Sequence, residues 1–191
     1  MIDYAAQFND IVVLPNSEVW IAGYTGLVVH KCGGTDCTSP NATYAVDCVR
    51  AMDFTSYDGW ILACSKIYHW NGDWSVLEWK LQWDKAEEGV SLEDIGFANS
   101  DDGWVVGYKS IFHPEAIILH WNGIEWQNIS LLDQIGRNDF ALNAIDVLSD
   151  DNVWVVGDVV LHWDGKQWQE IPLPKNINGL ESVSASNETD V

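Results

Sequence analysis

Four histidines recur at matching places along this 191-residue chain and are the first candidates for chemistry: His30, His69, His120 and His162. Neutral imidazole is the commonest metal ligand in proteins, so a ring of four could hold a metal ion. Each histidine belongs to a different repeat, however, and sheets stacked face to face lie about 10 Å apart. Because a metal needs its nitrogen ligands at about 2 Å, we predict structural histidines, each with one ring nitrogen hydrogen-bonded, and no metal site.

Acidic residues recur too, close to the turn that precedes a repeated tryptophan: Glu18, Asp58, Asp101, Asp102, Asp150, Asp151, Glu188 and Asp190. A calcium site needs six to eight converging oxygen ligands, so we predict a solvated acidic rim. No nucleophile elbow, phosphate loop, zinc signature or cofactor fingerprint occurs, and we expect no cofactor. Hydrolysis by paired carboxylates, as in a glycoside hydrolase, stays an open alternative, since their separation is invisible in a sequence.

The chain has 12 tryptophans, and most of them recur at fixed places in the repeats. Recurrence predicts packing of one repeat on the next, because one large aromatic side chain buries about 150–250 Å². Trp79 and Trp83 break this pattern and lie on one face of a predicted strand. We consider both as candidates for stacking on a ligand, with a thicker core as the alternative.

The repeat itself is an apolar pair, a polar turn, and a tryptophan followed by a small apolar strand. Its tryptophans are Trp20, Trp60, Trp104 and Trp154, spaced by 40, 44 and 50 residues. Short alternating strands with frequent turn signals, at this period, are typical of four-stranded β-propeller blades. The sequence therefore predicts an all-β fold, a propeller of four antiparallel blades plus the first strand of a fifth, as part of a larger ring or assembly.

The predicted single propeller segment spans 1–191, with blades at about 8–48, 49–90, 91–140 and 141–178 and a partial blade at 179–191. Tight type I′ hairpins are expected at the Asn-Gly or Asp-Gly pairs 71–72, 122–123 and 164–165. Leu180 to Ala185 repeat a first strand without its companions. An open edge of this kind is a liability, so we expect it to pair outside its own blade, in the next blade or with a neighbouring subunit.

The four cysteines fall into two pairs, Cys32 with Cys37 and Cys48 with Cys64. If the second blade turns near Ser56, Met52 faces Trp60 and Cys48 faces Cys64. We predict two disulfides, with buried free thiols as the alternative. Glycosylation sequons begin at Asn41, Asn128 and Asn187. Together these features favour an extracellular or cell-surface location.

The charge is strongly acidic, with 29 Asp and Glu against 9 Lys and Arg. Nucleic acid and anionic membrane surfaces would be repelled, and no stretch is long and apolar enough to span a membrane. Variable loops on a rigid scaffold usually carry binding. The candidates are Tyr108, Phe112, His113 and Glu115, beside the connections 84–90 and 131–139. We predict a binding or adhesion module for a neutral glycan or a protein, with a structural subunit of an oligomer as the alternative.

Two segments carry a family resemblance: Asp102-Gly103-Trp104-Val105-Val106-Gly107 and Leu161-His162-Trp163-Asp164-Gly165. They resemble the repeats of secreted bacterial and archaeal β-propellers. The chain is also similar to the photosystem II stability/assembly factors and to neuraminidase-type repeats. The resemblance implies the propeller fold over nearly the whole chain and implies little about activity, because the hairpin reads His-Trp-Asn/Asp-Gly where those repeats carry Thr and a second Gly.

Overall fold

The structure is a computed structural model that describes residues 8–15, 19–23, 27–31, 42–44, 48–55, 58–71, 79–84, 89–110, 112–177 and 179–186, with the backbone alone at 27–31 and 42–44. The chain forms two compact units, Met1–Lys85 and Ala86–Val191, and each is described by itself. Within the described residues no helix has the length and apolar character needed to cross a membrane.

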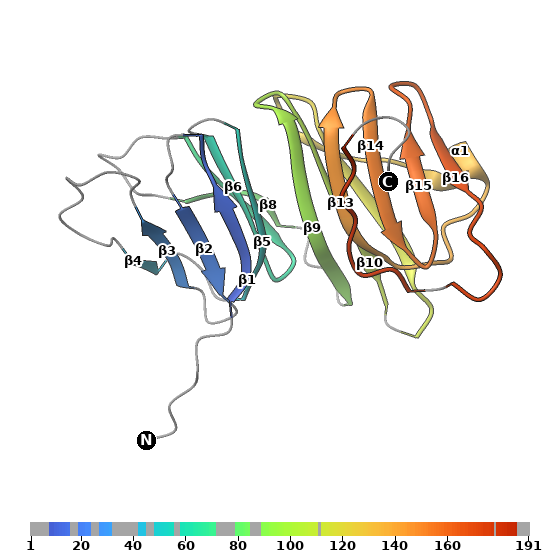
Figure 1. The fold of residues 1–191 in the computed structure, drawn as a ribbon, viewed down its shortest axis with the longest axis horizontal. Helices are drawn as coiled ribbons and strands as arrows, with labels where there is room; N and C mark the ends of the chain where they lie inside the picture. The colour runs from blue at the N-terminus through green and yellow to red at the C-terminus, as the bar shows by residue number, and fades with distance from the viewer. Residues whose placement is uncertain are drawn as a thin grey trace, which may run out of the picture. The chain divides into compact units, whose positions relative to one another are not determined.

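The first unit contains two four-stranded antiparallel sheets (Figure 1). One consists of β1 (Phe8–Val13), β2 (Val19–Gly23), β3 (Leu27–Lys31) and β4 (Ala42–Tyr44), and the other of β5 (Val49–Thr55), β6 (Asp58–Ala63), β7 (Lys66–Trp70) and β8 (Lys80–Asp84). The strands pair in chain order. Trp20 is fully buried and joins the sheets, since its ring lies 4.8 Å from that of Phe54 and 5.4 Å from that of Trp70.

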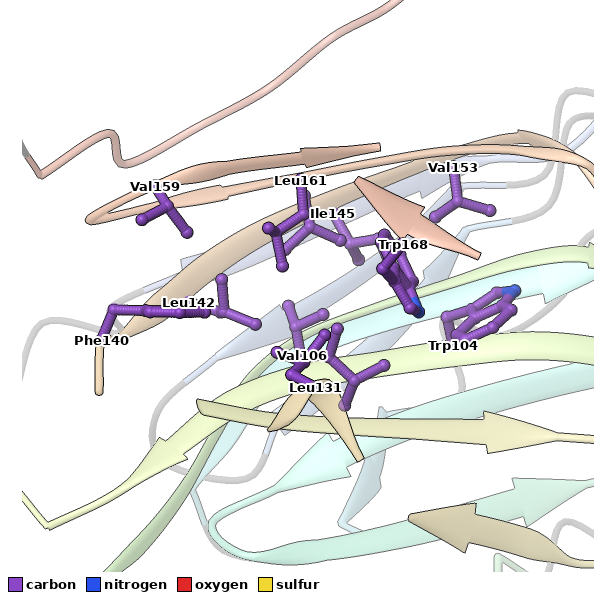
Figure 2. Packing of buried hydrophobic residues seen from close by; sticks show 12 residues of the cluster. Trp104, Val106, Leu131, Phe140, Leu142, Ile145, Val153, Val159, Leu161 and Trp168 are labelled. Carbon is purple, nitrogen blue, oxygen red and sulfur yellow. The ribbon is translucent and has the colours of Figure 1, made fainter. Parts of the chain in front are cut away.

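The second unit repeats this arrangement. Its sheets consist of β9 (Val90–Asn99), β10 (Asp102–Lys109), β11 (Glu115–Trp121) and β12 (Trp126–Asn128), then β13 (Leu142–Ser149), β14 (Asn152–Gly157), β15 (Val160–Trp163) and β16 (Trp168–Ile171). The short helix α1 (Leu131–Ile135) connects them. Trp104 of β10 packs against Trp168 of β16 with ring centroids 5.3 Å apart, and Val106 and Leu161 belong to the same core (Figure 2).

Sequential pairing and side chains that alternate between the two faces make each sheet a propeller blade. The all-β fold of four-stranded antiparallel blades is confirmed, and the chain is a partial β-propeller. The four sheets span residues 8–44, 49–84, 90–128 and 142–171.

One detail of the predicted strand pairing in the second blade is wrong. Met52 pairs with Ile61, and it is Asp53 that pairs with Trp60. A register shift between Val49 and Ala51 adds a residue, so Cys48 still lies opposite Cys64, whose amide donates to the Cys48 carbonyl at 2.9 Å. This bulge offsets the one-residue error at Met52, so the two cysteines lie opposite each other as predicted.

The hairpins at Asn122 and Asp164 are not two-residue type I′ turns. Trp121 pairs with Trp126, which leaves a four-residue loop. The Asn122 side-chain oxygen accepts hydrogen bonds from the amides of Ile124 and Glu125, both at 3.0 Å. Among the four residues of this loop, 122–125, only Gly123 has a positive φ, of 85°. The asparagine thus shapes the loop through its side chain, and Gly72 lies outside the described residues.

Candidate functional site

The histidines on the third strand of each blade are held in a repeated contact. His69, His120 and His162 stack on Trp60, Trp104 and Trp154 with ring centroids 4.1–4.2 Å apart. Their Nε2 atoms meet a side-chain oxygen of Asp58 at 2.5 Å, of Asp102 at 2.6 Å and of Asn152 at 2.9 Å. His30 pairs with Trp20 in the same register, but its side chain lies outside the described residues.

For His69, His120 and His162, this contact confirms the prediction of structural histidines with one bonded ring nitrogen. Each carboxylate or amide stands two residues before its tryptophan, on the same face of the strand. In the part of the chain that the structure describes, no three His, Cys, Asp or Glu side chains gather as a metal site. The histidines serve packing in this structure.

The prediction of a solvated acidic rim is wrong for two of its residues. Asp58 and Asp102 are the partners of His69 and His120, and their side chains are only 26% and 17% exposed. Asp101, Asp150 and Asp151 are exposed, as expected for turns. Glu18, Glu188 and Asp190 lie outside the described residues. The signal that separates the two groups is the position two residues before the tryptophan.

A second set of aspartates, which sequence reasoning missed, joins neighbouring blades. Asp94 on β9 accepts the amide hydrogens of Ile95 in its own strand and of Ile145 on β13, both at 2.9 Å. Asp10 on β1 does the same with Ile11 and with Met52 on β5, both at 2.7 Å. Burial raises the pKa of Asp10 above its ordinary value of 3.8, although these two bonds act in the opposite direction. An aspartate before an apolar residue on the first strand of each blade is the signal that could have revealed this.

The candidate binding loops do come together in the second unit. The β10–β11 loop and the β12–β13 connection lie at the same end of the sheets, because the Ala116 amide donates to the Asn138 carbonyl at 2.8 Å. The Asp158 amide donates to the Ala141 carbonyl at 3.0 Å and brings in the β14–β15 turn. We call this end, made of residues 108–110, 112–116, 131–141 and Asp158, the loop face.

The loop face offers apolar and acidic groups. Phe112 is 90% exposed at the tip of its loop, and Leu132 on α1 is 56% exposed. His113 and Glu115 are exposed, whereas Tyr108 is half-buried at the end of β10.

The cation of the β12–β13 connection is already paired. Arg137 bonds Asp139 at 3.1 Å and Glu170 at 3.6 Å, and its guanidinium lies 5.1 Å above the ring of Phe140. Over the whole loop face four acidic residues, Glu115, Asp133, Asp139 and Asp158, outnumber two cations, Lys109 and Arg137. An approaching ligand therefore meets acidic and aromatic groups, which suits a neutral or cationic partner.

The two tryptophan candidates belong to the first unit and are not part of this face. Trp79 packs in the core there, 6.3 Å from the rings of Trp20 and Trp70, so the packing alternative holds for it. Trp83 is half-buried on β8, opposite Ile67.

The structure describes some of the predicted cysteine and glycosylation sites. Cys48 and Cys64 face each other, since the Cys64 amide donates to the Cys48 carbonyl, and the predicted bridge between them stays a prediction. Asn128 is exposed on β12. Cys32, Cys37, Asn41 and Asn187 lie outside the described residues.

Comparison with known proteins identifies a family. The family model described as Photosynthesis system II assembly factor YCF48 matches residues 72–189. No relative is recognised among proteins of curated function.

Several solved structures share the fold at low identity. One is YCF48 bound to D1 peptide, with 15% identity and a TM-score of 0.60 over 89% of this chain and 54% of that one. YCF48 from Cyanidioschyzon merolae has 12% identity and a TM-score of 0.56 over 90% of this chain and 61% of that one. U3-55K has 12% identity and a TM-score of 0.65 over 87% and 52%. The chain thus spans about half the length of the solved structures it matches.

Proposed function

The chain belongs to the Photosynthesis system II assembly factor YCF48 family, and on that premise we propose that it is a protein-binding module that takes an extended segment of its partner on the loop face. The observation that carries the proposal is the exposed Phe112, which projects from a loop tied to a second irregular connection by the backbone hydrogen bond between Ala116 and Asn138. Aromatic side chains on rigidly supported loops are frequent anchors of protein interfaces.

Two further facts support a polypeptide partner. A structure with the same fold is YCF48 bound to D1 peptide, which concerns that protein and makes a peptide ligand reasonable for this one. The formal net charge of −20 and the paired Arg137 favour a neutral or cationic segment. The neutral glycan considered from the sequence is the competing ligand.

Paired peptide and glycan arrays test this proposal. The peptides should be extended segments whose net charge runs from strongly negative to strongly positive, some with and some without aromatic residues. We expect capture of neutral and cationic peptides. Phe112→Ser should weaken that binding at least about tenfold, since loss of a central aromatic anchor commonly costs more than ~1.4 kcal/mol.

The matched control is Ile124→Ser, because Ile124 is 84% exposed in the β11–β12 turn, at the other end of the same sheet. It should leave peptide binding unchanged. Capture of glycans alone, or equal loss in both variants, would contradict the proposal.

We also propose an extracellular or cell-surface location. The facing positions of Cys48 and Cys64 and the exposed side chain of Asn128 support it. Mass spectrometry of protein purified from its native source should find Asn128 glycosylated or the cysteines oxidised. An unmodified Asn128 together with reduced cysteines would count against this location.

A further inference from the structure

The turn between β11 and β12 brings together the groups for a reaction between two of its own residues, Asn122 and Gly123. The Asn122 side-chain oxygen accepts hydrogen bonds from the amides of Ile124 and Glu125, both at 3.0 Å. Two donors on one carbonyl oxygen make its carbon, Cγ, more electrophilic. They also stabilise the negative charge that forms on the oxygen when a nucleophile attacks, as the donors of an oxyanion hole do.

The backbone nitrogen of Gly123 is the nucleophile that follows directly along the chain, and its attack on Asn122 Cγ closes a succinimide ring. Within the described residues the Gly123 amide donates no hydrogen bond that the attack would have to break. Gly123 has no side chain and a φ of 85°, so no Cβ obstructs the approach. Because the turn holds both groups in place, little further ordering is needed for them to meet.

A carboxylate lies beside the same glycine. A Cβ placed on Gly123 would lie 3.2 Å from Asp101 Oδ1, and the Asp101 amide is itself held by Asn99 Oδ1 at 2.9 Å. At this range the carboxylate can accept the Gly123 amide proton directly or through one water. The turn therefore supplies an electrophile, a nucleophile and a base.

The fourth blade carries aspartate at the matching place, and its turn shows how the product of this reaction would be held. Asp164 Oδ1 accepts hydrogen bonds from the amides of Lys166 at 3.0 Å and Gln167 at 2.9 Å, as Asn122 does within its own turn. Asp164 Oδ2 accepts a further bond from Gln169 Nε2 at 2.7 Å. The bond from the Gln167 amide is the main cause that lowers the pKa of Asp164 below 3.8, so the carboxylate form is favoured there.

The third blade already holds a partner for the second oxygen of such an aspartate. Gln127 stands at the place of Gln169, directly after the tryptophan that follows each turn. Its Nε2 donates to Glu125 Oε1 at 3.3 Å. This bond is long and exposed, so Gln127 can turn to an aspartate at position 122 at little cost.

We propose that Asn122 is a self-modification site, at which the folded chain deamidates the asparagine with Gly123 as nucleophile and Asp101 as base. The Gly123 nitrogen forms a bond to Asn122 Cγ, and the bond from Cγ to Nδ2 breaks. Nδ2 leaves as ammonia with the proton that Gly123 loses and Asp101 passes on. One water then opens the succinimide, giving aspartate when the new bond to Cγ breaks and isoaspartate when the bond to the Asn122 backbone carbonyl breaks. No oxidant or reductant takes part.

Peptide mass spectrometry follows the reaction, because replacing the amide by a carboxyl group raises the mass of the peptide that contains Asn122. The full chain is incubated at neutral pH, once folded and once unfolded in guanidinium chloride. Two further Asn-Gly pairs, 71–72 and 178–179, calibrate the unfolded rate, since all three pairs should then react alike. We expect Asn122 to react at least as fast in the folded chain as in the unfolded one. A folded rate more than about tenfold lower overturns the proposal, because the turn would then hold the reacting groups apart.

Variants of the two turns separate the base from the Asn-Gly sequence itself. Asp101→Ala should slow the reaction of the folded chain at least about threefold and leave the unfolded rate unchanged. The matched control is Asp151→Ala, since Asp151 lies beside Gly165 in the fourth blade and should not affect Asn122. An unchanged folded rate in Asp101→Ala, or an equal loss in both variants, overturns the assignment of Asp101.

The Asn122→Asp variant tests whether the turn accommodates the product. Its melting temperature should be no lower than that of the wild type. Gln127→Ala should lower the melting temperature more in the Asn122→Asp background than in the wild type, because only the carboxylate offers Gln127 the bond that Gln169 makes in the fourth blade. A lower melting temperature of Asn122→Asp, or an equal effect of Gln127→Ala in both backgrounds, contradicts the proposed product geometry.

Discussion

His120→Ala should destabilise the second unit by about 2–3 kcal/mol. The change removes the 2.6 Å bond to Asp102 and the ring that stacks 4.1 Å from Trp104. Leaving a buried polar group without its partner costs about 1–3 kcal/mol, and an aromatic pair adds about 0.5–1.5 kcal/mol. The side chains of His120 and Asp102 are 26% and 17% exposed. Because water can partly replace the lost bond, we expect a total in the lower half of the sum of these two contributions.

The fourth blade shows which side chain can replace Asp102 as the hydrogen-bond partner of the histidine. Asn152 bonds His162 at 2.9 Å in the same arrangement, so Asp102→Asn should cost under about 1 kcal/mol, less than Asp102→Ala. The surface variant His113→Ala should change stability by no more than about 0.5 kcal/mol. Urea unfolding followed by tryptophan fluorescence measures all four.

A double-mutant cycle between positions 120 and 102 should give a coupling energy of about 1 kcal/mol. A cost of His120→Ala no greater than that of His113→Ala, or additive effects of His120→Ala and Asp102→Ala, would show that the histidine–aspartate contact does not stabilise the unit. A chelator should leave the melting temperature of the wild type unchanged, and a marked fall would point to a metal.

Three more predictions follow from contacts in the blades. Asp94→Ala should lower the free energy of unfolding by about 1–3 kcal/mol, because the amide of Ile145, a residue only 7% exposed, loses its acceptor. The exposed control Asp101→Ala should cost little. Equal losses for the two variants in urea unfolding would be evidence against the stabilising bond between Asp94 and Ile145. Material made under oxidising conditions should show a Cys48–Cys64 disulfide by non-reducing peptide mapping, worth about 3 kcal/mol for a loop of about 15 residues; two free thiols in such material would remove this prediction. Since burial raises the pKa of Asp10, ionisation is disfavoured in the folded state, so the wild type should lose stability relative to Asp10→Asn as pH rises above 3.8, and the difference should level off above the raised pKa. A stability difference between the wild type and Asp10→Asn that does not change with pH, or that grows in favour of the wild type as pH rises, would contradict a raised pKa of Asp10.

The strands and the tryptophan–histidine pairing could be predicted because both depend on alternation along a strand, a property of local sequence. The register of the second blade could not be predicted, because the alternation of apolar and polar residues does not reveal the extra residue near Arg50. The hairpin at Asn122 was misread because Asn-Gly suits two loop lengths, and side-chain bonds to Ile124 and Glu125 select the longer one.

The aspartates between blades were missed for a different reason. Asp94 and its partner Ile145 are 51 residues apart, and on an isolated strand an aspartate between apolar residues looks solvent-facing. The loop face was foreseen in part, because strand order alone puts the β10–β11 and β12–β13 connections at one end. Trp79 was proposed as a ligand contact because it lies outside the repeat, yet it fills the core of the first unit.

The central claim, that the loop face binds a polypeptide, is tested most directly by hydrogen exchange on the wild-type chain with and without the peptide that the array selects. We expect slower exchange at residues 109–110, 112–116 and 136–141, which include the tip at Phe112 and the Asn138 contact. Protection that leaves these residues unchanged and appears only elsewhere would contradict the claim.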